Sequence, residues 1–116
     1  MGHGTTHFSN SIYAALDYAF KDKGHPNIFL ATVEAYPSID SLKRLVDAYK
    51  PEEIVLAPFM IVAGDHAKND MAGDDPDSWY NKFKAAGYKV TPILKGLGEY
   101  RGIQELFVEH LKTIEQ

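Results

Sequence analysis

The chain has 116 residues, which is enough for one compact domain and too few for two. Its formal net charge is -4 and no cluster of Lys or Arg is present, which excludes the basic face of a typical nucleic-acid-binding protein. Cysteine is absent, so disulfides and thiolate metal sites are excluded, and any transition-metal site must use His, Asp or Glu.

Hydrophobic residues make up 45% of the chain and charged residues 24%, as in an ordinary soluble globular protein. No apolar run approaches the roughly 20 residues that span a bilayer, and no signal peptide is visible in the first ten residues, MGHGTTHFSN. We therefore expect a cytoplasmic protein without a membrane partner.

Helical and strand patterns alternate along the chain. Helical spacing of apolar residues alternates with short runs rich in β-branched residues, and glycine or proline follows most helical segments. In chain order, the predicted elements are helix 9–23, strand 28–33, helix 38–49, strand 54–62, helix 77–86, strand 88–94 and helix 102–114.

This alternation predicts a single α/β domain over residues 1–116, with a parallel sheet and helices on both faces. The runs 28–33 and 54–62 lack strict alternation of apolar and polar residues, which is typical of strands covered on both faces.

The chain opens on a glycine-rich turn, MGHGT, that leads into a helix without a preceding strand. In open α/β sheets such a turn follows the carboxyl end of a strand. We therefore expect that the first strand is missing and that the chain is the later part of a longer protein. Three strands would leave an exposed sheet edge, so a partner chain or a swapped segment is expected to cover it.

Polar side chains follow the strands at the rim where ligands bind in such sheets. His3 lies in the opening turn, Glu34 follows strand 28–33, and His66 follows strand 54–62. Two imidazoles and a carboxylate suit a divalent first-row metal such as cobalt, nickel, iron or zinc. Three protein ligands also leave coordination positions open for exchange.

Each of these residues also has a purely structural interpretation. His3 would be a solvated or capping histidine, Glu34 a helix cap, and His66 a loop histidine bonded to backbone. For Glu34 and His66 a site is the better interpretation, because Ser38 is better placed as the cap and His66 has the polar neighbours Asp65, Lys68, Asn69 and Asp70. For His3 taken alone, the two interpretations are balanced.

Five motifs give the chain a family resemblance: GHGT at 2–5, TVEAYP at 32–37, PFMIVAGDHAKNDMAGDD at 58–75, SWY at 78–80 and ILKGLGE at 93–99. In this order, over nearly the whole chain, they resemble the anaerobic cobalt chelatases, the CbiK-type sirohydrochlorin cobaltochelatases. The chain is similar to the second half of that two-part enzyme, so the resemblance implies that the half that walls the other side of the cleft is absent.

The resemblance implies a lyase that inserts cobalt(II) into sirohydrochlorin during cobalamin biosynthesis. By motif it places the metal ligands at His3, Glu34 and His66. It also implies a homo-oligomer, or the missing N-terminal half, as the partner that completes the cleft.

Two functional alternatives follow. In the first, His66 and Glu34 hold the metal, His3 is a ligand or the base that accepts a pyrrole proton, Lys68 and Lys95 bind the carboxylates of the tetrapyrrole, and Met71 faces the ring. In the second, the chain is a non-catalytic module that binds a metal or a tetrapyrrole. Insertion no faster than the uncatalysed reaction, together with tight binding, would favour the second.

Overall fold

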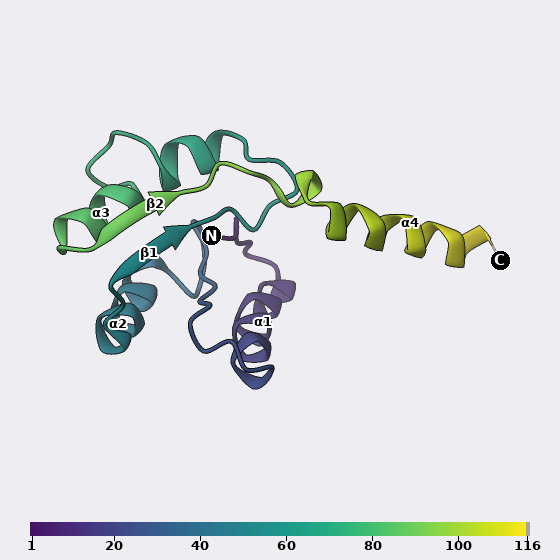
Figure 1. Ribbon diagram of the computed structural model, residues 1–116, viewed down its shortest axis with the longest axis horizontal. Helices are drawn as coiled ribbons and strands as arrows, with labels where there is room; N and C mark the ends of the chain where they lie inside the picture. Colours follow the sequence, from purple (N-terminus) through teal and green to yellow (C-terminus); the bar gives the residue numbers. More distant parts are fainter. Residues whose placement is uncertain (116) are drawn as a thin grey trace.

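The computed structural model describes residues 1–115 and shows an α/β fold (Figure 1). The helices are α1 (Ser11–Asp22), α2 (Ile39–Tyr49), α3 (Trp79–Ala85) and α4 (Arg101–Glu115), the strands are β1 (Glu53–Leu56) and β2 (Lys89–Pro92), and the short helical turns are η1 (Phe8–Asn10), η2 (His66–Met71) and η3 (Leu97–Glu99). The four predicted helices are thus confirmed, with small shifts at their ends. Within residues 1–115, no helix combines the length and apolar character needed to cross a membrane.

The regular sheet is shorter than the sequence predicts. β1 and β2 pair in parallel, with Ile54 opposite Val90. The prediction of a strand at 28–33 is wrong, because this segment contributes only one isolated parallel bridge, between Thr32 and Gly2. A regular ladder needs a neighbour along its length, and Met1–Gly2 offers a neighbour only at the end of the segment.

The first residues of the chain lie between residues 31–33 and 57–59, and they are hydrogen-bonded to both. Met1 bonds to one side and Gly2 to the other, which is the alternation of a central parallel strand. The four bonds run from the Met1 amine to Ala57 O (2.7 Å), Phe59 N–H to Met1 O (2.6 Å), Gly2 N–H to Ala31 O (2.8 Å) and Val33 N–H to Gly2 O (3.0 Å).

Helices cover both faces of this small sheet, as the sequence predicts. The Met1 side chain is buried in a core with residues of α2 and α3, namely Leu42, Val46, Trp79 and Phe83. Position 2 faces the opposite side of the sheet, because a Cβ added to Gly2 would lie 2.4 Å from the ring of Tyr13 in α1. Successive residues of a strand face opposite sides. Therefore α2 and α3 cover one face, and α1 covers part of the other.

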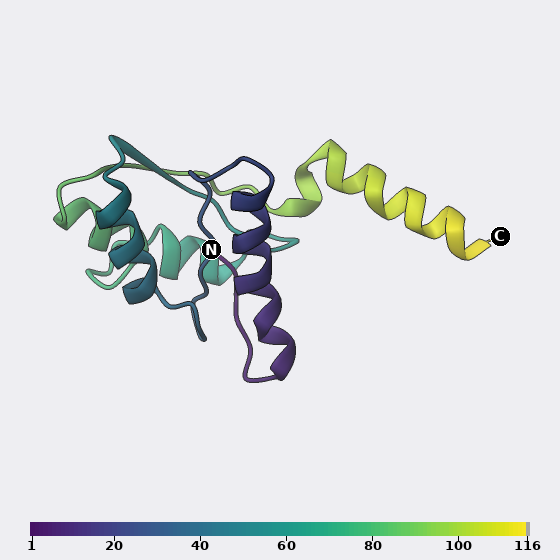
Figure 2. The same ribbon diagram turned by 90° about the horizontal axis from the view of Figure 1, so that it is seen from below.

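Helix α4 points away from this body in both views (Figures 1 and 2). Its apolar side chains at Leu106, Phe107, Val108 and Leu111 are between 52% and 60% exposed. Val55 of β1 is also 56% exposed. A helix with such residues normally buries them against a sheet or another helix, so α4 leaves both its own apolar side chains and part of the sheet uncovered.

Candidate metal centre

His3 is held in a tight turn that only glycine permits at the next position. Gly4 has φ +89°, in the left-handed region, and a Cβ on it would lie 3.0 Å from Ala35 and from Thr32. The turn therefore brings the His3 backbone directly against residues 32–35.

Glu34 lies in that adjacent turn. Its backbone N–H donates to His3 O (3.0 Å), which ties the two residues together. Thr32 is fully buried, and its hydroxyl accepts from the Ala35 N–H (3.0 Å) and donates to Pro37 O (3.1 Å). These bonds fix the direction in which the chain leaves Thr32, and hence the position of the Glu34 carboxylate.

His66 begins η2, a π-helical turn over His66–Met71. Ala67 and Met71, both fully buried, anchor this turn, while His66 remains partly exposed. Short π-helical segments are frequent at functional sites. Here the turn places the His66 ring beside the first residues of the chain.

The three predicted ligands lie together. Ligand atoms of His3, Glu34 and His66 all lie within 4.8 Å of one another, as a shared metal ion requires. The Nε2 atoms of the two histidines are 2.9 Å apart, His3 Nδ1 is 3.6 Å from Glu34 Oε2, and His66 Nε2 is 3.8 Å from Glu34 Oε1. The side chains of His3, Glu34 and His66 are 45%, 51% and 37% exposed, so the cluster is open to an incoming ligand.

Hydrogen bonds at the other ring nitrogens define the chemistry of this cluster. His3 Nδ1 is 2.8 Å from Gly4 O, and His66 Nδ1 is 2.6 Å from Asp70 Oδ2. A carbonyl and a carboxylate only accept, so each Nδ1 carries the hydrogen and each Nε2 presents a lone pair. Two lone pairs 2.9 Å apart repel unless a proton or a cation lies between them. The geometry of the cluster is therefore compatible with a bound cation.

Asp70 was not predicted as a site residue. It holds His66 in the arrangement usual for metal-binding histidines, in which a carboxylate accepts a hydrogen bond from the second ring nitrogen. The signal was present in the sequence, because residues four apart meet on one face of a helical turn.

The residues proposed for tetrapyrrole binding differ in their exposure. Lys68 is exposed on η2. Lys95 is exposed, and its Nζ lies 4.2 Å above the ring of Tyr100. Met71 is fully buried and packs in the core, so in this structure it offers no surface to a ring.

Comparison with known proteins shows the family of the chain. The model of the CbiK cobalt chelatase family matches residues 1–116. The sirohydrochlorin cobaltochelatase of Salmonella typhimurium is 46% identical over 114 residues, and these cover 96% of this chain and 42% of that protein. The sirohydrochlorin cobaltochelatase CbiKC of Nitratidesulfovibrio vulgaris is 34% identical over 111 residues, which cover 96% of this chain and 39% of that protein. The chain thus spans about two fifths of the length of these relatives, and it belongs to the CbiK cobalt chelatase family.

Proposed function

We propose that this chain is the metal-holding part of a chelatase that inserts cobalt(II) into sirohydrochlorin. The observation that carries the proposal is the convergence of His3, Glu34 and His66 in one solvent-accessible cluster. Cobalt and sirohydrochlorin come from the names of the two relatives. Nickel, iron and zinc suit the same donors, and affinity alone would not select cobalt among them.

Insertion exchanges the protein ligands of the metal for four pyrrole nitrogens and releases two pyrrole protons. His66, oriented by Asp70, and Glu34 hold the ion at positions that a macrocycle can approach from solvent. The Glu34 carboxylate offsets part of the metal charge. His3 Nε2 is either the third ligand or, once the ion has left, the acceptor of a pyrrole proton, because one nitrogen cannot do both at once.

Sirohydrochlorin carries many carboxylates, whereas this chain has a net charge of -4, so local cations must bind the substrate. Lys68, on the same turn as His66, is the nearest candidate in sequence. Lys95 is a second candidate, an exposed residue whose ammonium lies 4.2 Å from the centre of the Tyr100 ring. We place the opposite wall of the cleft in the part of the longer relatives that this chain does not match.

Cobalt binding tests the ligand assignment without requiring turnover. We expect His66→Ala and Glu34→Gln each to weaken cobalt(II) affinity in calorimetry by about tenfold or more, since each removes a ligand. His110→Ala is the matched control, because His110 is exposed on α4, outside the cluster. Unchanged affinity in both ligand variants would refute the assignment.

The alternative is a module that binds the metal without turnover, and the family match does not favour it. Mixing the chain, cobalt(II) and sirohydrochlorin while recording absorbance separates the two functions. A rate above the protein-free reaction that falls in His66→Ala supports chelatase activity. Cobalt binding with a rate equal to the protein-free reaction supports the module.

A further inference from the structure

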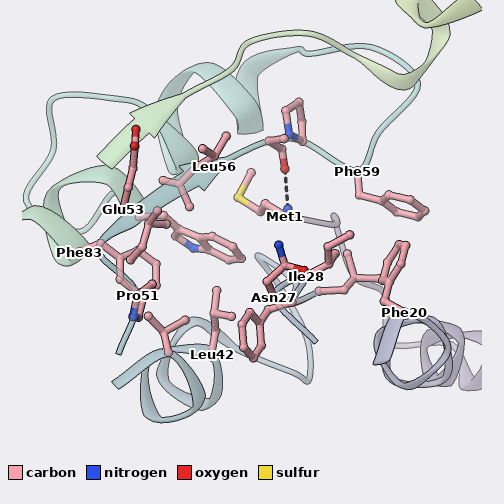
Figure 3. Close-up of a pocket in the computed structure, with 18 of the residues that line it drawn as sticks. Met1, Phe20, Asn27, Ile28, Leu42, Pro51, Glu53, Leu56, Phe59 and Phe83 are labelled. Atoms are coloured by element: carbon pink, nitrogen blue, oxygen red, sulfur yellow. Dashed lines mark hydrogen bonds between the residues drawn. The ribbon is translucent and has the colours of Figure 1, made fainter. Parts of the chain in front are cut away.

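An apolar cavity of about 510 Å³ lies between residues 27–30 and β1 (Figure 3). It is poorly suited to a macrocycle that carries many carboxylates. Within residues 1–115, the only charged side chain of its lining is that of Glu53, which repels carboxylates, and none of His3, Glu34 and His66 lines it. A macrocycle that receives the metal must instead lie beside these three residues, on the exposed side of the cluster.

Asn10 ties the loop after His3 to the turn after Glu34. Its Oδ1 accepts from the Thr5 N–H (3.0 Å), and its Nδ2 donates to Tyr36 O (2.6 Å). Thr5 and Tyr36 each lie two residues beyond a member of the cluster. One side chain therefore fixes both segments next to the candidate metal centre.

These two segments carry exposed aromatic rings. Tyr36 is 71% exposed, and Phe8, in η1, is 85% exposed. The centroid of the Phe8 ring lies 4.1 Å from that of the His7 ring, with 36° between the two planes. A single exposed apolar residue is ordinary, but these rings come from two segments that Asn10 holds together. Their flat apolar faces suit the flat face of a conjugated ligand.

Hydrogen bonding fixes the tautomer of His7. Its Nδ1 accepts from the Ser9 backbone N–H (3.1 Å). A backbone N–H only donates, so in the neutral ring the hydrogen lies on Nε2. The His7 side chain is exposed, and within residues 1–115 its Nε2 has no hydrogen-bond partner. Position 7 therefore offers an oriented N–H donor to solvent, and a carboxylate is a strong acceptor for it.

We propose that His7, Phe8 and Tyr36 form the surface that binds the metal-free macrocycle. Phe8 and Tyr36 pack against the apolar face of the tetrapyrrole, and the His7 Nε2–H donates to one of its carboxylates. This inference rests on the proposed chelatase function, and it adds residues that recognise the organic substrate to those that hold the metal. Because Asn10 holds both segments beside the cluster, a ring bound there lies close to the ion.

Titration of the chain with metal-free sirohydrochlorin, followed by absorbance, tests the aromatic part of this surface without turnover. We expect Phe8→Ser and Tyr36→Ser each to weaken binding by about fivefold or more, since each removes a ring that packs on the macrocycle. Tyr18→Ser is the matched control, because Tyr18 is 73% exposed on α1, outside both segments. We expect it to change binding by less than about twofold.

Two variants of His7 test the donor. His7→Phe keeps a flat ring without an N–H, whereas His7→Gln keeps an N–H donor of similar reach. Neither retains the ring nitrogen that accepts from Ser9, so a difference between them reports the donor and not the local turn. We expect His7→Phe to weaken macrocycle binding by about fivefold or more, and His7→Gln by less than about twofold.

Several outcomes would overturn this surface. They are no binding of sirohydrochlorin by the unaltered chain, equal losses in Tyr36→Ser and Tyr18→Ser, or equal losses in the two His7 variants. Self-association that the Phe8 and Tyr36 substitutions abolish would also overturn it, because a second copy would then occupy the surface. Cobalt affinity should stay unchanged in all these variants. The metal assignment fails separately, if His66→Ala leaves cobalt affinity unchanged.

Discussion

At the residue scale, the site is defined by the contacts that orient each imidazole as much as by the imidazoles themselves. Asp70 accepts from His66 Nδ1 at 2.6 Å, and Gly4 O does the same for His3 at 2.8 Å. Family motifs and strand ends identified His3, Glu34 and His66, and the structure brings the three together; metal binding by them stays a prediction. Asp70 was missed because its spacing of four from His66 brings the two together only on a helical turn, and no helical element was predicted over 66–71.

Replacing Asp70 tests its orienting role. In Asp70→Asn the amide can present its NH₂ to His66 Nδ1, which favours the tautomer that carries hydrogen on Nε2. We expect cobalt affinity to fall by about 10- to 100-fold, and ¹⁵N chemical shifts of the His66 ring to report the changed tautomer. Asp74→Asn, a nearby exposed carboxylate without a bond to His66, is the control. An unchanged ring spectrum would show that Asp70 does not set the tautomer.

The Met1 amine gives the chain a pH-dependent stability. Burial lowers the pKa of this amine from 8.0 to about 5. Between these values the unfolded chain binds a proton that the folded chain does not, so the free energy of unfolding rises with pH from about 5 to about 8. The slope is at most about 1.4 kcal/mol per pH unit. Urea unfolding at a series of pH values measures it, and an N-acetylated chain that retained the same slope would exclude the amine as its source.

At the element scale, apolar periodicity predicted the helices well because each one has local start and stop signals. Ser38 caps α2, accepting from the Ser41 N–H at 3.3 Å, and glycine with φ +89° follows α1 at Gly24. The strands were predicted less well. Segment 28–33 has a strand composition, but a strand also needs a hydrogen-bonded neighbour, and that is a property of the whole sheet.

Substitutions at Gly4, in the turn that carries His3, and at Gly24, after α1, distinguish the cost of backbone strain from the cost of steric crowding. Gly4 and Gly24 share φ +89°, but a Cβ would contact Ala35 and Thr32 at 3.0 Å from Gly4 and nothing within 4 Å from Gly24. We expect Gly24→Ala to lower the free energy of unfolding by about 1 kcal/mol. Gly4→Ala should lower it further and also weaken cobalt binding. Equal costs in urea unfolding, with cobalt affinity unchanged, would contradict this role for the turn.

At the scale of the whole molecule, the body and α4 differ in how they are stabilised. Phe83 is 1% exposed in the core, whereas Phe107 of α4 is 58% exposed. The sequence predicted α4 from its apolar spacing but contained no signal for its direction, because periodicity identifies an apolar side and not its neighbour.

Alanine substitutions at the buried Phe83 and at the exposed Phe107 test this difference between the body and α4. We expect Phe83→Ala to cost about 3–5 kcal/mol in the free energy of unfolding, since it leaves a cavity in the core. Phe107→Ala should change it by about 0.5 kcal/mol or less, as at other surface positions. Chemical denaturation followed by circular dichroism measures both values, and a large cost at Phe107 would mean that α4 packs on the body in solution.

The projecting helix also has a practical consequence. An isolated helix of 15 residues is only marginally stable in water, and α4 exposes apolar side chains to solvent. We therefore expect chains at high concentration to associate through α4, as exposed apolar patches do. Dilute samples, or a version that ends at Tyr100, are the right material for measuring what the histidine cluster binds.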